Sequence, residues 1–224
     1  MIGLRIAAGV FALLVAVLLA QMLFAPQREP APAMTHGMPW QIEHPGPGQS
    51  RVFGLTLGGS AASTLADARR LSPEAPTLAL LTPQDAPPAL EAYFESVSLG
   101  ALTGKLVLSI AASPGDLEAM RSNAAKTDHL ETGIRKYVLH EADRQRAEAL
   151  PLAAIAFIPS ARLDEAVILQ RFGTPAERIR QGDRLEHFLY PAQGLDIVLD
   201  SKGKEVLQYV APADFARLRA PLGK

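Results

Sequence analysis

The residues whose types and spacing most suggest chemistry are two methionines and two histidines in a proline-rich segment near the N-terminus. They are Met34, His36, Met38 and His44. Thioether sulfur and imidazole nitrogen are ligands that bind copper, so a copper-handling protein is one hypothesis for this chain. The alternative is a polar tether, because four ligands without a fixed geometry hold a metal ion only weakly.

The patterns that mark common enzyme sites are absent from the sequence. No Gly-x-Ser-x-Gly nucleophile turn occurs, and His140-Glu141 lacks the second histidine of the zinc-protease helix. Gly58-Gly59-Ser60 lacks the lysine and the spacing of a phosphate-binding loop. The chain also has no cysteine, which removes thiolate metal sites and a cysteine nucleophile. We therefore predict a protein that is not an enzyme and needs no cofactor.

The remaining charged residues have simpler interpretations. His187 alternates with Phe188 along a predicted strand, so we expect its side chain on an exposed face of the sheet. Glu91 and Glu95 are expected on one face of another exposed strand. The 22 Lys and Arg residues balance 23 Asp and Glu residues without a long basic run, which argues against nucleic-acid binding.

Aromatic residues are better candidates for function. Along residues 186–190 bulky side chains point to both faces of the predicted strand, whereas a sheet covered by helices needs only one such face. Tyrosine-rich sheet surfaces suit contacts with other proteins. The candidate contact residues are Trp40, Tyr93, Phe188, Tyr190 and Tyr209. The alternative is that these rings pack inside the protein, with Trp40 against the edge of the domain.

The N-terminus reads as a membrane anchor. Residues 6–25 are apolar or small apart from Gln21, and a helix of this length covers about 30 Å, the thickness of a bilayer core. Arg5 precedes the segment, so the positive-inside rule places the rest of the chain in the periplasm. We predict a single-pass protein of the inner membrane. A signal peptide cleaved near Ala31-Pro-Ala33 is the alternative.

The folded part shows the same order of elements twice. Residues 163–172 have the apolar spacing of a helix, Gly173 ends it, and strand-like runs follow at residues 185–190, 195–199 and 205–210. Earlier, residues 51–57 read as a strand and a short helix ends at Leu71. Strand-like runs follow it at residues 77–81, 90–97 and 105–111. Two echoes of local sequence between these parts predict a tandem repeat.

The predicted fold class is α+β, with two helix-plus-antiparallel-meander units in tandem behind a single transmembrane helix. The expected organisation is a transmembrane anchor at 1–25, a proline-rich stalk at 26–50, a first unit at 51–126, a connecting segment at 127–150 and a second unit at 151–224.

The second unit resembles a small outer-membrane-assembly lipoprotein domain called BamE or SmpA/OmlA. The residues that carry the resemblance are Val167, Phe172-Gly-Thr-Pro175, Glu186-His-Phe-Leu-Tyr190, Ile197-Val-Leu-Asp200 and Glu205-Val206. Tandem copies of such a unit are also similar to the β-lactamase inhibitor protein fold. The lipidated cysteine of the lipoproteins is replaced here by an apolar segment. The resemblance implies a sheet that binds protein, with no catalytic group.

These observations favour a membrane-anchored periplasmic protein-interaction module. We expect an accessory or assembly factor for an envelope complex, with an envelope or inner-membrane protein as its partner. An inhibitor-like or ligand-sensing module that occludes a target with its concave sheet is the second hypothesis, and copper handling through the stalk is the third.

Overall fold

The computed structural model describes residues 37–84, 86–130 and 133–223. Its main feature is one ten-stranded sheet in which every neighbouring pair of strands is antiparallel. Across the sheet the strands are β6 (Lys126–His129), β7 (Arg135–Val138), β3 (Thr77–Thr82), β4 (Ala89–Leu99), β5 (Leu102–Ile110), β8 (Leu152–Pro159), β12 (Val206–Val210), β11 (Leu195–Asp200), β10 (Leu185–Tyr190) and β9 (Glu177–Gln181).

The helices in the described residues are short. They are α2 (Leu65–Ala68), α3 (Pro114–Ser122), α4 (Glu141–Glu148), α5 (Glu165–Phe172) and α6 (Ala216–Arg219). Four 3₁₀ turns, η1 to η4, cover Arg69–Leu71, Pro191–Gln193, Pro212–Asp214 and Ala220–Leu222. A separate hairpin joins β1 (Ser50–Val52) to β2 (Leu55–Leu57).

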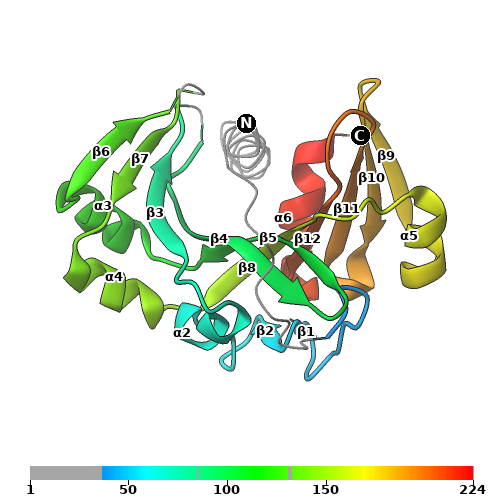
Figure 1. Ribbon diagram of the computed structural model, residues 1–224, viewed down its shortest axis with the longest axis horizontal. Coiled ribbons are helices and arrows are strands. Elements are labelled where there is room, and N and C mark those ends of the chain that lie inside the picture. Colours follow the sequence, from blue (N-terminus) through cyan, green and yellow to red (C-terminus); the bar gives the residue numbers. More distant parts are fainter. Residues whose placement is uncertain (1–36, 85, 131–132, 224) are drawn as a thin grey trace.

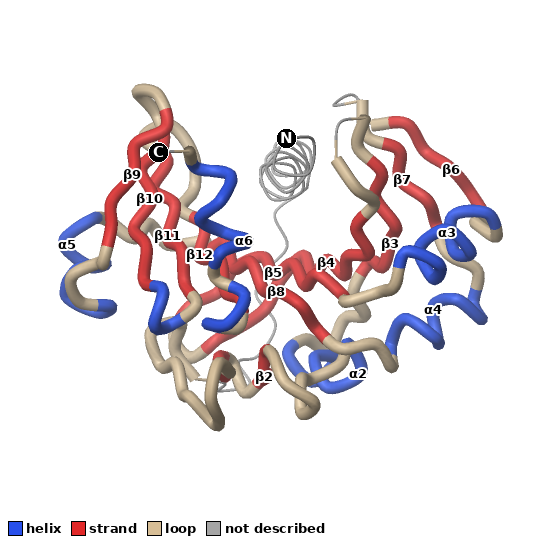
Figure 2. The backbone as a smooth tube through the Cα atoms, turned by 180° about the vertical axis from the view of Figure 1, so that it is seen from behind, coloured by secondary structure: helices blue, strands red, loops and turns tan. Residues whose placement is uncertain are grey.

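The sheet is bent into a U, with β5 and β8 at its base (Figure 1). Helices α2, α3, α4 and α5 lie on the outside of the U, and α6 lies inside it against one arm (Figures 1 and 2). A register shift in β4 between Phe94 and Val97 gives β4 one residue more than the paired stretch of β5, and such a bulge bends and twists the strand. Among the described helices, α2, α3, α4 and α5 therefore lie against the convex face and α6 against the concave face (Figures 1 and 2).

The predicted fold class is wrong. Instead of two separate helix-plus-meander units, the chain forms one large antiparallel sheet with few helices, joined across its centre by β5 and β8. The connectivity of the two arms also differs. Outward from the centre the strands are β5, β4, β3, β7 and β6 on one side, but β8, β12, β11, β10 and β9 on the other. Residues 127–150, predicted as a connecting segment, supply most of β6, all of β7 and α4.

Local capping groups set the helix boundaries. Thr64 and Ser113 each accept a hydrogen bond from the third residue of their helix and receive the reciprocal carboxylate, so both form capping boxes. Asp164 caps α5 through the Val167 amide, and Gly173 follows its last residue with φ 80°. These caps fix where α2, α3 and α5 begin, and hence which residues they turn toward the sheet.

The main core lies between the sheet and the outer helices. Phe157, on the convex face of β8, packs near Phe53, whose ring also lies 5.6 Å from that of Tyr209. Close packing at the base of the U requires glycine at position 104. A Cβ there would overlap the Ile158 carbonyl oxygen and the ring of Phe157.

Residues 51–57 form a tight hairpin and not the single strand that the sequence predicts. Phe53 has a positive φ of 56°, which is unusual for a bulky residue, and its side chain is buried in the core. Gly54 follows with φ 72°. Burial of the Phe53 ring offsets the backbone strain of the turn.

No helix in residues 37–84, 86–130 and 133–223 is long and apolar enough to cross a membrane. The predicted anchor at residues 6–25 and the first part of the predicted stalk lie outside the described residues.

Candidate binding surface on the concave sheet face

Alternation along the strands sorts the side chains between the two faces of the sheet. On β12, Val206, Gln208 and Val210 face the concave side, and Leu207 and Tyr209 face the main core. Helix α6 covers part of the concave side. Its Leu218, together with Phe215, packs on Leu189 and Val210. This small cluster covers one part of the concave face, and the apolar residues described next lie outside it.

A second apolar cluster forms what we call the concave floor, at the base of the U. It consists of Val107, Ala156, Ile158, Val198 and Val206. Val107 is paired with Ala156, and Val198 with Val206, so these side chains are cross-strand neighbours. Among the described residues the apolar side chains that pack against the floor are Tyr93 and Leu185, and no described helix covers it. All five side chains of the floor are nevertheless buried, with only 2–4 % of their surface exposed.

Tyr93 stands at one side of the floor in a small polar network. It is paired with Val107, and its hydroxyl donates a hydrogen bond to Glu95 Oε2 at 2.5 Å. Lys105 Nζ lies 3.0 Å from Glu95 Oε1 and 5.8 Å from the centre of the Tyr93 ring. Burial and the neighbouring Glu95 carboxylate raise the pKa of the Tyr93 hydroxyl, so Tyr93 stays neutral and presents a ring with a fixed hydroxyl.

Glu91 lies on the same face of β4, next to Tyr93 along the strand. It is paired with Ala79 on one side and Ser109 on the other. The side chain is buried, and no other described residue gives it a hydrogen bond or an ion pair. Burial without a compensating partner raises the pKa of the Glu91 carboxyl from 4.5 to about 8. At neutral pH Glu91 is therefore mostly an uncharged carboxylic acid.

A buried polar row crosses the other arm of the concave face. His187 Nδ1 lies 2.8 Å from Asp196 Oδ2, and Asp196 is paired across the strands with Gln208. His187 Nε2, Asp196 Oδ1 and Gln208 Oε1 are buried and have no hydrogen-bond partner in the described structure. Burial raises the pKa of Asp196, and the hydrogen bond from His187 opposes that rise.

The structure overturns two expectations about exposure. His187 is buried and paired with Asp196, whereas the alternation with Phe188 predicted an exposed imidazole. Glu91 is buried as well, although its neighbour Glu95 is partly exposed. Strands β4 and β10 are buried on both faces, and the alternation of side chains along a strand does not show how far each face is shielded from solvent.

Three of the five aromatic candidates belong to the core. Phe188, Tyr190 and Tyr209 are buried on the convex face, in the same cluster as α5. The Tyr190 hydroxyl donates to the Gly173 carbonyl at 2.9 Å, and the Tyr209 hydroxyl donates to the Pro39 carbonyl at 3.0 Å. These rings hold helix α5 and the N-terminal segment against the sheet, so they offer no free surface to a partner.

Trp40 and Tyr93 occupy different places. Trp40 is partly buried at the convex edge, where its ring lies 6.1 Å from that of Phe172 and the Arg171 guanidinium lies 4.8 Å above it. Tyr93 is the one aromatic candidate placed beside the concave floor. The residues that sequence reasoning missed there are Lys105, Asp196 and Gln208. The sequence signal that could have found Asp196 and Gln208 is a polar residue inside an otherwise apolar strand, as in Leu195–Asp200 and Val206–Val210.

The described part of the stalk gives no structural support to the copper hypothesis. Met34 and His36 lie outside the described residues. The Met38 sulfur accepts a long hydrogen bond from the Ala101 amide, and His44 Nδ1 contacts the Gln49 carbonyl at 3.2 Å. Met38 and His44 are thus engaged with separate neighbours. Among the described residues no group of three or more His, Cys, Asp or Glu side chains is arranged to hold a metal ion.

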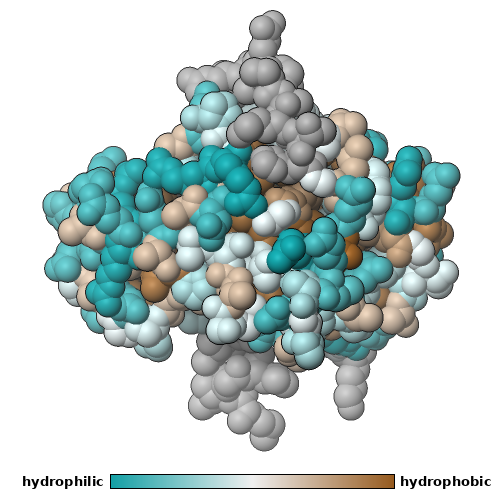
Figure 3. Space-filling model, turned by 90° about the horizontal axis from the view of Figure 1, so that it is seen from below, coloured by the Kyte–Doolittle hydropathy of each residue, from teal (hydrophilic) through white to brown (hydrophobic). Residues whose placement is uncertain are grey.

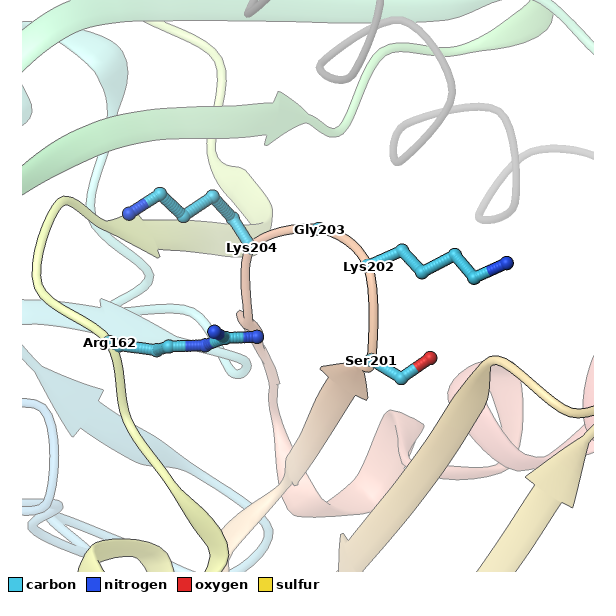
Figure 4. Close-up of a pocket in the computed structure, with 5 residues that line it drawn as sticks. All are labelled: Arg162, Ser201, Lys202, Gly203 and Lys204. Atoms are coloured by element: carbon cyan, nitrogen blue, oxygen red, sulfur yellow. The ribbon is translucent and has the colours of Figure 1, made fainter.

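A small cavity of about 290 Å³ lies at the turn between β11 and β12. It is lined by Arg162, Ser201, Lys202, Gly203 and Lys204. The side chains of Lys202 and Lys204 point to opposite sides of the turn (Figure 4). Lys204 Nζ donates to the Ser160 carbonyl, and Arg162 lies 3.5 Å from Glu205. Because the positive charges diverge and two of them have partners, this cavity does not concentrate charge on a compact anion.

The edges and the outer surface are polar. Edge strands β6 and β9 are short, charged and mostly exposed, a composition that discourages pairing with strands of other chains. Seen from below, the surface is mainly hydrophilic, with smaller hydrophobic areas between polar side chains (Figure 3). The concave floor is therefore the most distinctive candidate for a binding surface.

Comparison with known proteins finds no match to a family model, to a curated protein or to a solved structure. The resemblance to the outer-membrane-assembly domain consequently remains a prediction, and the function has to be argued from the geometry of this chain.

Proposed function

We propose that this protein is a binding module that holds another protein against the concave face of its sheet. The observation that carries the proposal is the concave floor: an apolar cluster at the base of the U that no described helix covers. The convex face of the same strands is packed under α2, α3, α4 and α5. The five side chains are buried in the structure, and an apolar cluster of this kind is the type of surface that forms the buried core of a protein contact.

The residues around the floor suit a protein contact better than catalysis. Tyr93 supplies a rigid aromatic surface, and Lys105 and Glu95 provide a polar rim. The floor extends over β5, β8, β12 and β11, which at about 4.8 Å per strand spacing is a width of roughly 14 Å. A surface of this width accommodates a helix or a loop of a partner chain.

The cellular setting is part of the same proposal. An inner-membrane anchor at residues 6–25 would place this binding face in the periplasm, so the partner would be an envelope or inner-membrane protein. Within that setting, an accessory or assembly role is the simplest use of a binding face without a catalytic group.

We expect the double substitution Tyr93→Ala and Lys105→Ala to reduce recovery of the partner at least about tenfold. The reason is that it removes a ring and a charge at the side of the floor while leaving the convex core intact. The measurement is a pull-down of the tagged full-length protein from its native membranes in mild detergent, followed by quantitative mass spectrometry.

The matched control is Glu141→Ala with Arg144→Ala on the outer helix α4, where both side chains are exposed and pair with each other. This variant should retain the partner. Equal recovery with both double variants would show that the concave face is not the binding surface.

A further inference from the structure

We propose that a group of basic side chains on the arm formed by β9 to β12 rests on a bilayer surface that contains anionic lipids. We call this group the basic ridge. It comes from the loop after β8, the end of β9 with the β9–β10 turn, and the β11–β12 turn. Its members are Arg162, Arg180, Arg184, Lys202 and Lys204. This inference goes beyond the proposed function, because it concerns a surface outside the concave floor.

Hydrogen bonds bring the three chain segments of the ridge together. The Ser201 amide donates to the Arg184 carbonyl at 3.0 Å, which joins the two turns. Lys204 Nζ donates to the Ser160 carbonyl at 2.5 Å, which joins the β11–β12 turn to the loop after β8. The basic side chains therefore lie on neighbouring parts of one surface.

Two buried carboxylates hold arginines whose guanidinium groups stay at the surface. Arg184 donates two hydrogen bonds to Asp200, at 2.6 and 2.5 Å, and Arg162 lies 3.5 Å from Glu205. The side chains of Asp200 and Glu205 are 4 % exposed, whereas those of Arg184 and Arg162 are 48 % and 69 % exposed. The hydrogen bonds from Arg184 also keep the pKa of Asp200 low, so this carboxylate stays charged. Each pair therefore points its positive end outward.

Exposed acidic residues are scarce in the same segments. In residues 160–162, 180–184 and 200–205 the exposed acid is Asp183, and Asp164 just beyond the ridge is engaged as the cap of α5. The exposed basic residues of these segments are Arg162, Arg180, Arg184 and Lys202. Such an excess of positive charge is attracted to anionic lipid, with a gain in binding of about fivefold per basic residue near the surface.

The directions of the side chains fit an extended anionic surface better than a compact anion. Lys202 and Lys204 point to opposite sides of their turn (Figure 4). Their charges therefore do not converge on one point, as they would around a bound phosphate. When the tip of the turn touches a bilayer, the two ammonium groups can meet separate lipid headgroups.

The composition of the ridge favours lipid over a protein or a nucleic acid. Residues 160–162, 180–184 and 200–205 include no aromatic and no large aliphatic side chain. Protein contacts typically depend on large side chains that fill pockets at the centre of the interface, and single-stranded nucleic acids stack their bases on aromatic rings. A charged surface with glycine and serine between its cations suits peripheral contact with a bilayer.

The N-terminal sequence keeps the ridge within reach of a bilayer. The anchor proposed at residues 6–25 leaves residues 26–36 before the described chain, and a segment of this length spans at most about 40 Å. The described domain would therefore stay close to the membrane, and contact through the ridge would fix its orientation there.

The test uses the full-length protein reconstituted into vesicles, with one fluorophore at a defined site. Because the chain has no cysteine, Ser201→Cys places a single label on the ridge, and Thr127→Cys places one on β6 at the other end of the sheet. The vesicles consist of phosphatidylcholine alone or with phosphatidylglycerol, and both contain a lipid with a quencher in its headgroup.

At low salt we expect quenching at position 201 to be at least about threefold greater in the anionic vesicles than in the neutral ones. Quenching at position 127 should be equal in both. Raising the ionic strength from about 0.05 M to about 0.5 M should abolish the difference at position 201, because the Debye length shortens. Equal quenching at position 201 in both vesicles, or failure of the protein to float with the anionic vesicles, would overturn the inference.

Charge reversal identifies the residues responsible. Arg180→Glu with Lys202→Glu, introduced into the Ser201→Cys protein, should remove most of the additional quenching. The matched control is Lys126→Glu with Arg144→Glu, which changes the net charge equally at exposed positions of the other arm and should preserve the quenching. Equal quenching with the two double variants would also contradict the ridge.

The outcomes separate this inference from the proposed function, because the vesicles contain no partner protein. Expected quenching at position 201, together with partner recovery that does not depend on Tyr93 and Lys105, would support the ridge and refute the proposed function. Absence of quenching, together with weaker recovery of the native partner by the Arg180→Glu and Lys202→Glu protein, would assign the ridge to a protein contact and refute the lipid surface.

Discussion

Replacing Glu91 with glutamine is expected to flatten the dependence of stability on pH between about pH 4.5 and pH 8. In the folded protein burial raises the pKa of Glu91 to about 8, against 4.5 for an unperturbed glutamate. Between these values the folded state holds a proton that the unfolded state has released. The free energy of unfolding therefore falls as pH rises through this window and becomes constant above it.

The size of this effect follows from the shift in pKa. At about 1.4 kcal/mol per pKa unit, the free energy of unfolding changes by at most about 5 kcal/mol across the window. Urea unfolding at a series of pH values measures it. Asp196, whose pKa is also raised by burial, contributes a slope of the same sign in both proteins, so the comparison between them isolates Glu91. An unchanged slope in the Glu91→Gln protein would show that Glu91 is not withdrawn from water.

The second large effect is expected from Phe157→Ala. Phe157 is fully buried on β8 at the junction of the two arms, with its ring 5.6 Å from that of Phe53. Loss of a buried phenylalanine typically costs about 3–5 kcal/mol, since the cavity adds to the lost transfer free energy. Urea unfolding followed by fluorescence and by circular dichroism should show this loss in a single shared transition.

A matched change in a smaller cluster provides the control. Phe215→Ala removes a ring that packs with Leu218 against the concave side, outside the main core. A smaller loss of stability is expected there. Two separate transitions in the Phe157→Ala protein would contradict a single cooperative sheet and would support two units that fold independently.

Much of the local structure can be predicted from this sequence because its signals are local. The apolar spacing of residues 163–172 with Gly173 predicts α5, and alternating runs predict β10, β11 and β12. The strand β9 is missed because Glu177–Gln181 is an edge strand made almost entirely of charged and polar residues. The hairpin at Phe53 and Gly54 is missed because a phenylalanine with positive φ carries no turn signal.

The arrangement of the sheet is harder to predict because it depends on pairs far apart in the chain. Nothing local indicates that β5 pairs with β8, yet this pairing turns two expected units into one sheet. The same limit applies to the candidate site. Alternation along β10 correctly places His187 and Phe188 on opposite faces of the sheet. It does not show which face the helices cover, because that depends on how α5 and α6 pack.

The central claim is that the concave face holds a partner protein, and position-specific photo-crosslinking tests it most directly. A photoreactive phenylalanine analogue replaces Tyr93 beside the floor in one full-length protein and Arg144 on the outer helix α4 in another. After irradiation in native membranes, we expect the Tyr93 position to yield a reproducible crosslink to a different protein and the Arg144 position to yield none. Crosslinks from position 93 only to residues 6–25 of the same chain or to a second copy, or equal yields from both positions, would contradict the claim.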